Sequence, residues 1–317
     1  MRTHATSPRL NIFMIEIISQ LALVAGLLAT LLVGPGIAVA FLIIRKKRRR
    51  SRGRSPIGID LLRTPGHTLR EKLEEASGDL MWDVVLLCLI PMMALATFLA
   101  QAHLTGLAHM THLAPVYVVA VLGFIAWMVR KLLKAGEHLD NLRAGYDAEL
   151  AVGQELDQLM RSGAVVFHDF PADGFNIDHV VIAHEGVFAV ETKGFTKPGD
   201  KKGRASATVA FDGHLLKFPS WTTSEPLEQA ERQAKWLSKW ATSAVGGMVV
   251  ATPVLALPGW FVERTGKSVV RVYSGRALAS LLKTPSNQLL TPEDVQRIAH
   301  QVEQRCRTVV PTYRRTT

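Results

Sequence analysis

The stretch IDHVVIAHEGVFAVETK, residues 177–193, decides the fold of the second half of this chain. It contains two short runs of β-branched and aromatic residues, with Glu185 and Gly186 between them. Runs of this composition, separated by a turn that contains glycine, are typical of paired β-strands. The sequence therefore predicts a β-hairpin whose strands occupy residues 177–182 and 186–193.

Charged residues stand near the ends of both predicted strands, where the neighbouring residues are apolar. Asp178 lies in the first strand, and Glu191, Thr192 and Lys193 end the second. Side chains alternate along a strand, so Glu191 and Lys193 share one face while Thr192 points away. A hairpin would also bring Asp178 beside Glu191. Two carboxylates and one ammonium group are therefore expected to meet at one end of a sheet.

Two interpretations of this cluster remain open at this point. Mg²⁺ binds one or two carboxylates, keeps several water molecules and leaves room for a substrate phosphate. A metal there would acidify a water molecule and stabilise charge on phosphate oxygens, and Lys193 would orient or help deprotonate the water. The alternative is an ordinary surface ion pair of little energy. The first interpretation predicts phosphodiester hydrolysis.

A longer ordered series of segments bears on this choice. The segments are GYDAELAV at 145–152, DFP at 169–171, IDHVV at 177–181, GVFAVETKG at 186–194 and PLEQAERQ at 226–233. Together they resemble the nuclease-related domain family, NERD, of the PD-(D/E)xK nuclease superfamily, over about residues 143–257. A series in this order is far more specific than any one of its segments.

The resemblance implies a restriction-endonuclease-like fold, with a mixed central sheet flanked by helices. It also implies roles for residues of the predicted hairpin. Asp178 and Glu191 would be the metal carboxylates, the backbone carbonyl of Thr192 a further metal ligand, and Lys193 the catalytic lysine. The implied cofactor is Mg²⁺ or Mn²⁺, and the implied substrate is DNA.

Two residues outside the hairpin also receive roles through the resemblance. Glu149 would be a catalytic acid carried by a helix, and Gln229 a catalytic polar residue on a later helix. Ala148 stands where the family usually has glycine. From the residues alone, Glu149 and Gln229 are equally readable as solvated helix positions, and Gln233 follows Gln229 by one helical turn.

The first 140 residues have a different character from the rest. Three apolar runs, at about 21–44, 81–100 and 113–133, are each long enough to cross a hydrocarbon layer of about 30 Å. The first run is followed, not preceded, by basic residues, which is the reverse of a signal peptide. We therefore expect an all-α membrane region of about three transmembrane helices.

Basic residues around these runs predict their orientation. An unbroken basic run occupies residues 45–50, and Arg130, Lys131 and Lys134 close the third apolar run. The segment between the second and third runs contains histidines but no lysine or arginine. The positive-inside rule then places the N-terminus outside and both the 45–80 loop and the chain after residue 134 in the cytoplasm. A bacterial inner membrane is the expected location, with "bacterial" taken from the resemblance.

The net charge of +10 divides unevenly, with +7 on residues 1–140 and +3 on residues 141–317. The basic composition therefore reflects membrane loops more than a basic nucleic-acid-binding domain. The segment at residues 45–54 is expected to contact anionic lipid, with DNA as the alternative. One local basic loop follows Lys193. We expect its basic residues to contact a nucleic-acid backbone; the alternative is a solvated loop without a partner. These residues are Lys197, Lys201, Lys202 and Arg204.

The remaining patterns complete an α/β domain at residues 141–260, with a strand and helix extension of the same domain at 261–317. Helices are predicted at 144–160, 226–240 and 292–306, and strands at 164–170, 248–257 and 269–273. A hairpin is predicted around Asp212 and Gly213. Thr291 followed by Pro292 has the composition of a helix start.

These observations lead to one principal hypothesis and two alternatives. The principal hypothesis is a membrane-anchored, metal-dependent nuclease that hydrolyses DNA on the cytoplasmic face. The first alternative is a catalytically silent DNA-binding or assembly module tethered to the membrane, with protein partners in DNA processing or transfer. The second is a membrane protein that senses a ligand through its histidine-bearing outer segment.

Overall fold

The computed structural model describes residues 57–105, 113–197, 207–286 and 288–311, together with residues 37, 41, 44 and 45. The first expected span, the basic run at 45–50, His109 and His112 therefore lie largely or wholly outside the described residues, as do Lys201, Lys202 and Arg204. The described chain forms two compact units. Residues 76–137 belong to one, and residues 57–75 with 138–311 belong to the other.

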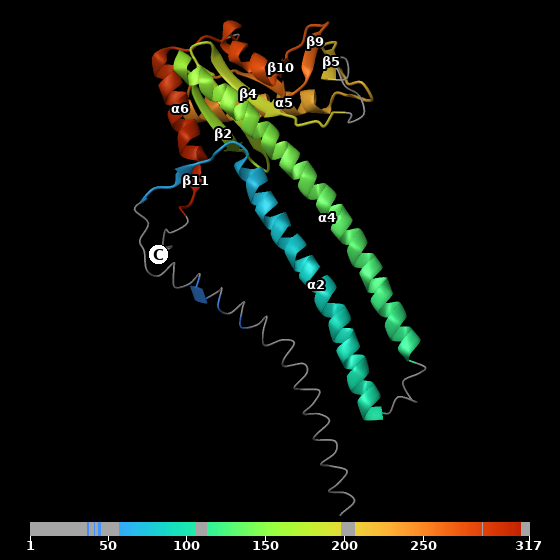
Figure 1. The fold of residues 1–317 in the computed structure, drawn as a ribbon. Coiled ribbons are helices and arrows are strands. Elements are labelled where there is room, and N and C mark those ends of the chain that lie inside the picture. Colours follow the sequence, from blue (N-terminus) through green and yellow to red (C-terminus); the bar gives the residue numbers. More distant parts are fainter. Residues whose placement is uncertain are drawn as a thin grey trace, which may run out of the picture. The chain divides into compact units, whose positions relative to one another are not determined.

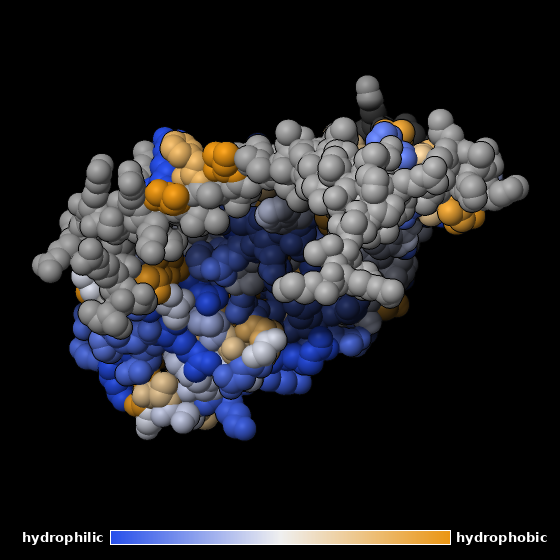
Figure 2. Space-filling model, turned by 90° about the horizontal axis from the view of Figure 1, so that it is seen from below, coloured by the Kyte–Doolittle hydropathy of each residue, from blue (hydrophilic) through white to orange (hydrophobic). Residues whose placement is uncertain are grey.

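Two long helices, α2 (His67–Thr105) and α4 (Ala114–Asp157), pass through the first unit (Figure 1). Both are long and apolar enough to cross a membrane, by length and composition alone, and they contain the runs expected at 81–100 and 113–133. Their outward-facing side chains include large apolar residues such as Trp82, Leu95 and Val119. In the space-filling view of Figure 2, much of the coloured surface is hydrophilic, and strongly hydrophobic residues lie in a few separate places.

The two helices contact each other within the first unit through polar and aromatic groups. Lys131 Nζ lies 2.6 Å from Asp83 Oδ1, and Tyr117 donates a hydrogen bond of 2.8 Å to Gln101. Asp83 is buried in this contact. Asp83 stands near the start of the apolar run at 81–100, and the ion pair with Lys131 compensates its buried charge.

The helix predicted at 144–160 is the last part of α4, which continues into a 3₁₀ turn, η1 (Gln158–Ser162). No proline interrupts the chain between the apolar run and this segment, so the helix is continuous. The expected domain boundary at residue 140 lies inside α4. Gly163, at φ 86°, ends η1 in a left-handed conformation that favours glycine.

A mixed five-stranded sheet forms the centre of the second unit, with the order β10-β8-β4-β3-β2. Its strands are β2 (Val165–Pro171), β3 (Asn176–Ala183), β4 (Gly186–Thr192), β8 (Ala251–Leu257) and β10 (Arg271–Ser274). The β3–β4 pair is antiparallel, which confirms the predicted hairpin, while β4–β8 and β8–β10 are parallel. The α/β class and the mixed sheet are therefore confirmed.

Strand β8 begins at Ala251 and not at Met248 as predicted. Gly246 ends the preceding helix α5 (Glu225–Val245), and the next backbone groups bond to side chains instead of to a neighbouring strand. The Val249 N–H donates to Thr242 Oγ1 at 3.0 Å, and the Val250 N–H donates to Gln288 Oε1 at 2.8 Å.

Helices cover both faces of the central sheet. On one face, α5 and α6 (Pro292–Cys306) bury apolar side chains such as Leu237 and Val302 against Ile182 and Ala189 of the sheet. On the other face, the end of α4 and a 3₁₀ segment, η3 (Gly275–Lys283), pack on residues such as Phe188. The predicted start of α6 is confirmed, because Thr291 Oγ1 accepts the Asp294 N–H at 3.1 Å.

A second, four-stranded sheet has the order β7-β6-β5-β9. Its strands are β5 (Thr208–Phe211), β6 (Leu216–Lys217), β7 (Thr222–Thr223) and β9 (Phe261–Arg264). The β5–β6 pair is the hairpin predicted around Asp212 and Gly213. Asp212 Oδ1 accepts the N–H groups of His214 and Leu215, and Gly213 has φ 103°, so both residues suit the turn.

A short strand before α2 pairs with the end of the described chain. This strand, β1 (Leu61–Leu62), is antiparallel to β11 (Arg307–Val309). The sequence analysis assigned residues 45–80 only to a loop. The pairing was not predictable from local pattern because β1 has two residues and its partner lies about 245 residues away along the chain.

Candidate functional site

The end of the β3–β4 hairpin brings together the acids that the sequence places there. Asp178, half-buried on β3, accepts a hydrogen bond of 2.6 Å from the backbone N–H of Thr192 through Oδ2. This contact joins the second residue of the IDHVV segment to the residue after Glu191. The hairpin register thus holds Asp178 at the end of β4, as expected from strand pairing.

Glu191 is buried, with 2% of its surface exposed, and both of its carboxylate oxygens have partners. Lys193 Nζ lies 2.8 Å from Oε1, which agrees with the two residues sharing a face of β4. Gln233 Nε2 donates a hydrogen bond of 2.6 Å to Oε2. A buried carboxylate needs such partners because losing its hydration without compensation is costly.

Gln233, and not Gln229, makes the side-chain contact with Glu191. Gln233 is 3% exposed and also donates to the backbone carbonyl of Asn176 at 3.3 Å. Gln229 lies one turn earlier on α5 and is half-buried. Gln229 and Gln233 are one helical turn apart and point in similar directions. The sequence alone therefore could not show which of the two contacts Glu191.

Glu149 reaches the same cluster from α4. Its pKa is raised from 4.5 to about 8 because the carboxylate is buried and lies near the negative charges of Asp169 and Glu191. The charge of Lys193 and a hydrogen bond from the Gly66 backbone N–H act in the opposite direction. Glu149 therefore shares the electrostatic environment of Glu191 and Lys193, although it is remote from them in sequence.

The pKa of Asp178 is raised well above its ordinary value, first by burial and then by the charges of Glu191 and Glu149. The Thr192 N–H and the Lys193 ammonium partly oppose this shift. The structure thus brings together three carboxylates and one lysine in a poorly hydrated place. Repulsion disfavours full ionisation of such a group, and a bound cation would favour its ionised form.

A close approach of β4 and α4 explains how Glu149 arrives there. A Cβ on Gly194, just after Lys193, would lie 2.7 Å from both the Ala144 carbonyl oxygen and the Ala148 Cβ. Gly194 therefore allows the chain after β4 to touch the helix backbone. Ala148, in the position where the family usually has glycine, forms part of this contact with a single methyl group.

The donor chemistry of the cluster suits a hard divalent cation. Among the residues that the structure describes, no three His, Cys, Asp or Glu side chains are grouped so that they would all hold one metal ion. Mg²⁺ needs only one or two protein carboxylates, with water and backbone oxygens completing its shell. Asp178 and Glu191 meet that smaller requirement at the end of adjacent strands.

The predicted basic loop is described only in part. Lys197 is exposed, and its Nζ would lie 3.6 Å from a Cβ on Gly259, in the turn after β8. Lys197 thus extends along the same sheet edge as Lys193. The expectation for Lys201, Lys202 and Arg204 falls on residues outside the described ranges.

A second buried polar cluster, unremarked in the sequence, lies behind the hairpin. His168 Nδ1 and His179 Nδ1 are 2.9 Å apart, and His168 Nε2 lies 3.1 Å from Asp157 Oδ1. Burial lowers the pKa of both histidines. Neutral histidines at this position link α4 to β2 and β3, which supports the strand that carries Asp178.

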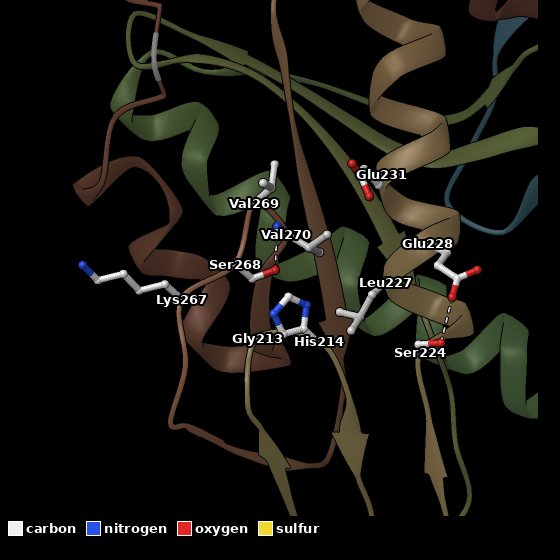
Figure 3. Close-up of a pocket in the computed structure, with 10 residues that line it drawn as sticks. All are labelled: Gly213, His214, Ser224, Leu227, Glu228, Glu231, Lys267, Ser268, Val269 and Val270. Carbon is white, nitrogen blue, oxygen red and sulfur yellow. Dashed lines mark hydrogen bonds between the residues drawn. The ribbon is translucent and has the colours of Figure 1, made fainter.

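A cavity of about 610 Å³ lies elsewhere in the second unit (Figure 3). The β5–β6 turn, the start of α5 and the 267–270 segment surround it, and none of the predicted site residues lines it. Glu228 and Glu231 face it from α5, while the Lys267 side chain points away. Because none of the residues of the ordered motif series that carry charge at the hairpin end lies there, the carboxylate–lysine cluster remains the candidate site.

Comparison with known protein families agrees with this geometry. Residues 144–258 match the nuclease-related domain family, NERD. This segment is therefore similar to a NERD domain. It contains Glu149, Asp178, Glu191, Lys193 and both glutamines, whereas α6 and the residues before α2 lie outside the match. No curated protein and no solved structure matches the chain.

The contacts of Gln233 predict a difference between the two glutamines of the NERD domain. Gln233→Ala leaves one oxygen of buried Glu191 without its donor and is expected to lower the free energy of unfolding by about 1–3 kcal/mol. Gln229→Ala is expected to change it by less than about 0.5 kcal/mol. Denaturant unfolding of the full chain in detergent, followed by tryptophan fluorescence, measures both. Equal losses would contradict the assignment of Gln233.

The raised pKa of Glu149 predicts a pH-dependent stability without divalent metal. Between pH 4.5 and about 8 the folded protein binds more protons at Glu149 than the unfolded chain does, so stability falls as pH rises. In EDTA, the thermal midpoint of the full chain should decrease from about pH 5 to about pH 9. Glu149→Gln should reduce this slope, while Glu155→Gln on the same helix should keep it. Identical slopes for all three proteins would exclude Glu149 as the cause.

Proposed function

We propose that this protein is a membrane-anchored, metal-dependent nuclease that hydrolyses DNA phosphodiester bonds on the cytoplasmic face of a bacterial inner membrane. The observation that carries the proposal is the convergence of Glu149, Asp178, Glu191 and Lys193 within a NERD domain. Structural ion pairs alone seldom place three carboxylates around one lysine in a buried position, because like charges raise one another's pKa.

In this proposal, Asp178, Glu191 and the backbone carbonyl of Thr192 would hold Mg²⁺ or Mn²⁺. When bound, such an ion supplies charge stabilisation at the phosphate and acidification of a water molecule. Gln233 holds Glu191 in place through Oε2, and the Thr192 N–H does the same for Asp178. These hydrogen bonds reduce the number of orientations available to the two acids before substrate arrives.

Lys193 has the position of a group that acts on the scissile phosphate. Its ammonium lies 2.8 Å from Glu191 and is partly exposed, so it can reach both the carboxylate and a substrate. In hydrolysis, water oxygen bonds to phosphorus, the bond to the leaving sugar oxygen breaks, and one water proton is lost as the leaving oxygen gains a proton. Lys193 would orient the water and stabilise negative charge on the phosphate, and Glu149 would complete the acidic group.

The membrane location is supported by the two candidate spans and by their charges. α2 and α4 each present exposed apolar side chains over a length that suits a bilayer. Arg130, Lys131 and Lys134 follow the apolar part of α4, whereas residues 101–112 contain no lysine or arginine. By the positive-inside rule this arrangement favours a cytoplasmic NERD domain that contacts DNA, with lipid around the helices.

The nuclease proposal predicts that the full chain, purified in detergent, cleaves DNA with Mg²⁺ or Mn²⁺ and not in EDTA. Asp178→Ala and Lys193→Ala should each lower the rate by about 100-fold or more, because the first removes a proposed metal ligand and the second removes a positive charge beside the phosphate. Lys235→Ala, which removes a well-exposed lysine of α5, is the matched control and should cleave at the wild-type rate.

Linear duplex, supercoiled and single-stranded DNA and an RNA of the same sequence form the substrate panel. Cleavage that survives both site substitutions would reject the site. Wild-type protein that binds labelled DNA in fluorescence anisotropy but cuts none of the panel would favour the silent DNA-binding module instead.

The proposed orientation predicts opposite behaviour for two reporter fusions. Alkaline phosphatase fused after residue 140 should be inactive, and green fluorescent protein at the same point should fluoresce, because that point lies in the cytoplasm. Fusions within residues 106–112 should show the reverse pattern. Active phosphatase after residue 140 would overturn the orientation.

A further inference from the structure

We propose that residues 63–68, which immediately precede and begin α2, are a positioning element of the candidate site that packs along the surface of α4 from which Glu149 projects. This inference rests on the proposed function and deepens it, because it adds to the site a segment outside the matched NERD domain. We refer to residues 63–68 as the strap.

Both ends of the strap are fastened to the second unit. Arg63 Nη1 lies 2.9 Å from Asp169 Oδ2, and the Arg63 N–H donates to the Cys306 carbonyl at 3.2 Å. At the other end, the Thr68 N–H and hydroxyl donate to the same Asp169 oxygen at 3.1 and 2.7 Å. Asn176 Nδ2 bonds both Asp169 Oδ1 and the Thr68 hydroxyl.

Asp169 is the carboxylate to which both ends of the strap bind. It is 3% exposed and has φ 49°, a left-handed conformation that no other non-glycine residue of the described chain adopts. Such a conformation costs free energy and persists where surrounding contacts hold it. Here four polar groups from three parts of the chain converge on one carboxylate, and two of them belong to Thr68.

Between its fastened ends the strap lies along one stripe of α4. A Cβ on Gly66 would lie 2.7 Å from the Tyr146 ring, and a Cβ on Gly153 would lie 2.6 Å from Pro65. Tyr146, Glu149 and Gly153 are spaced three and four residues apart, which places them on the same side of a helix. The strap therefore covers the surface of α4 from which Glu149 projects.

Gly66 also immediately precedes the first residue of α2. Its carbonyl accepts the Arg70 N–H at 2.8 Å, and its own N–H lies close enough to the Glu149 carboxylate to lower the pKa of that group. Two neighbouring N–H groups of this helix start thus face acids, Gly66 toward Glu149 and Thr68 toward Asp169. Unpaired N–H groups and partial positive charge at a helix start favour carboxylates in these places.

This geometry makes the first turn of a candidate membrane helix part of the nuclease site. Residues 144–258 alone contain Glu149 but not the strap that packs beside it on α4. Displacing the strap by about 1 Å would loosen the packing around Glu149, and displacements of this size in positioned groups lower rates by up to about 100-fold.

The test compares Gly66→Ala with Gly246→Ala in the full chain in detergent. Both glycines have similar left-handed φ values, 68° and 71°, but only the Gly66 methyl group would meet another side chain. With Mg²⁺ and DNA, Gly66→Ala should lower kcat by about 10- to 100-fold with KM changed less than about 2-fold. Gly246→Ala should match the wild type. Tyr146→Ala combined with Gly66→Ala should recover kcat relative to Gly66→Ala alone, by removing the ring that the methyl group meets.

Hydrogen–deuterium exchange of residues 63–68 in EDTA supplies a readout that does not require cleavage. The strap amides should be protected in wild type and in Gly246→Ala, and should exchange at least about 10-fold faster in Gly66→Ala. If Gly66→Ala does not fold, Thr68→Val takes its place, since it removes the hydroxyl from Asp169 and keeps the side-chain shape; it should give the same changes in exchange and kcat.

Wild-type kcat in a variant whose strap exchanges faster would overturn the inference, and so would an unprotected strap in the wild type. A wild-type chain that cuts no DNA would defeat the proposed function instead, while the exchange experiment would still show whether the strap is seated on α4.

Discussion

Mutual repulsion among buried carboxylates is the constraint on which the rest of this structure depends. Burial and the negative charge of Glu191 raise the pKa of both Glu149 and Asp178, and the charge of Glu149 raises the pKa of Asp178 further. Such a group is tolerated only if donors and cations surround it. Lys193, Gln233 and the N–H groups of Thr192 and Gly66 supply that surrounding in the protein itself. A divalent cation would complete it.

Each of these partners is delivered by a different feature of the fold. The β3–β4 register supplies the Thr192 amide, strand alternation supplies Lys193, and α5 lying across one face supplies Gln233. The close contact of Gly194 with α4 brings in Glu149, and the strap supplies Gly66. The β3–β4 hairpin and the parallel strand β8 of the mixed sheet bring these partners to one edge, where the carboxylates lie. The same contacts therefore stabilise the buried carboxylates and fix their positions in the candidate site.

Features that depend on residues close together in the sequence were predicted correctly, and features that depend on distant segments were not. The hairpin, the β5–β6 turn and the start of α6 were predictable because turn residues and strand composition act within a few positions. The apolar runs within α2 and α4 were visible for the same reason. The continuity of α4 through residue 140 was missed, since a change from apolar to polar composition suggests a boundary although helix geometry does not require one.

By itself, the sequence determined the strand pair, the acids and lysine at its ends, and the presence of a NERD domain, because local periodicity and ordered motifs encode them. Only the tertiary structure decided which glutamine reaches Glu191 and that residues 63–68 lie against Glu149. Those contacts join segments between about 40 and 100 residues apart in the chain, and they depend on helix rotation and close packing at Gly66 and Gly194. No local pattern carries that information, since it arises only when the helices pack on the sheet.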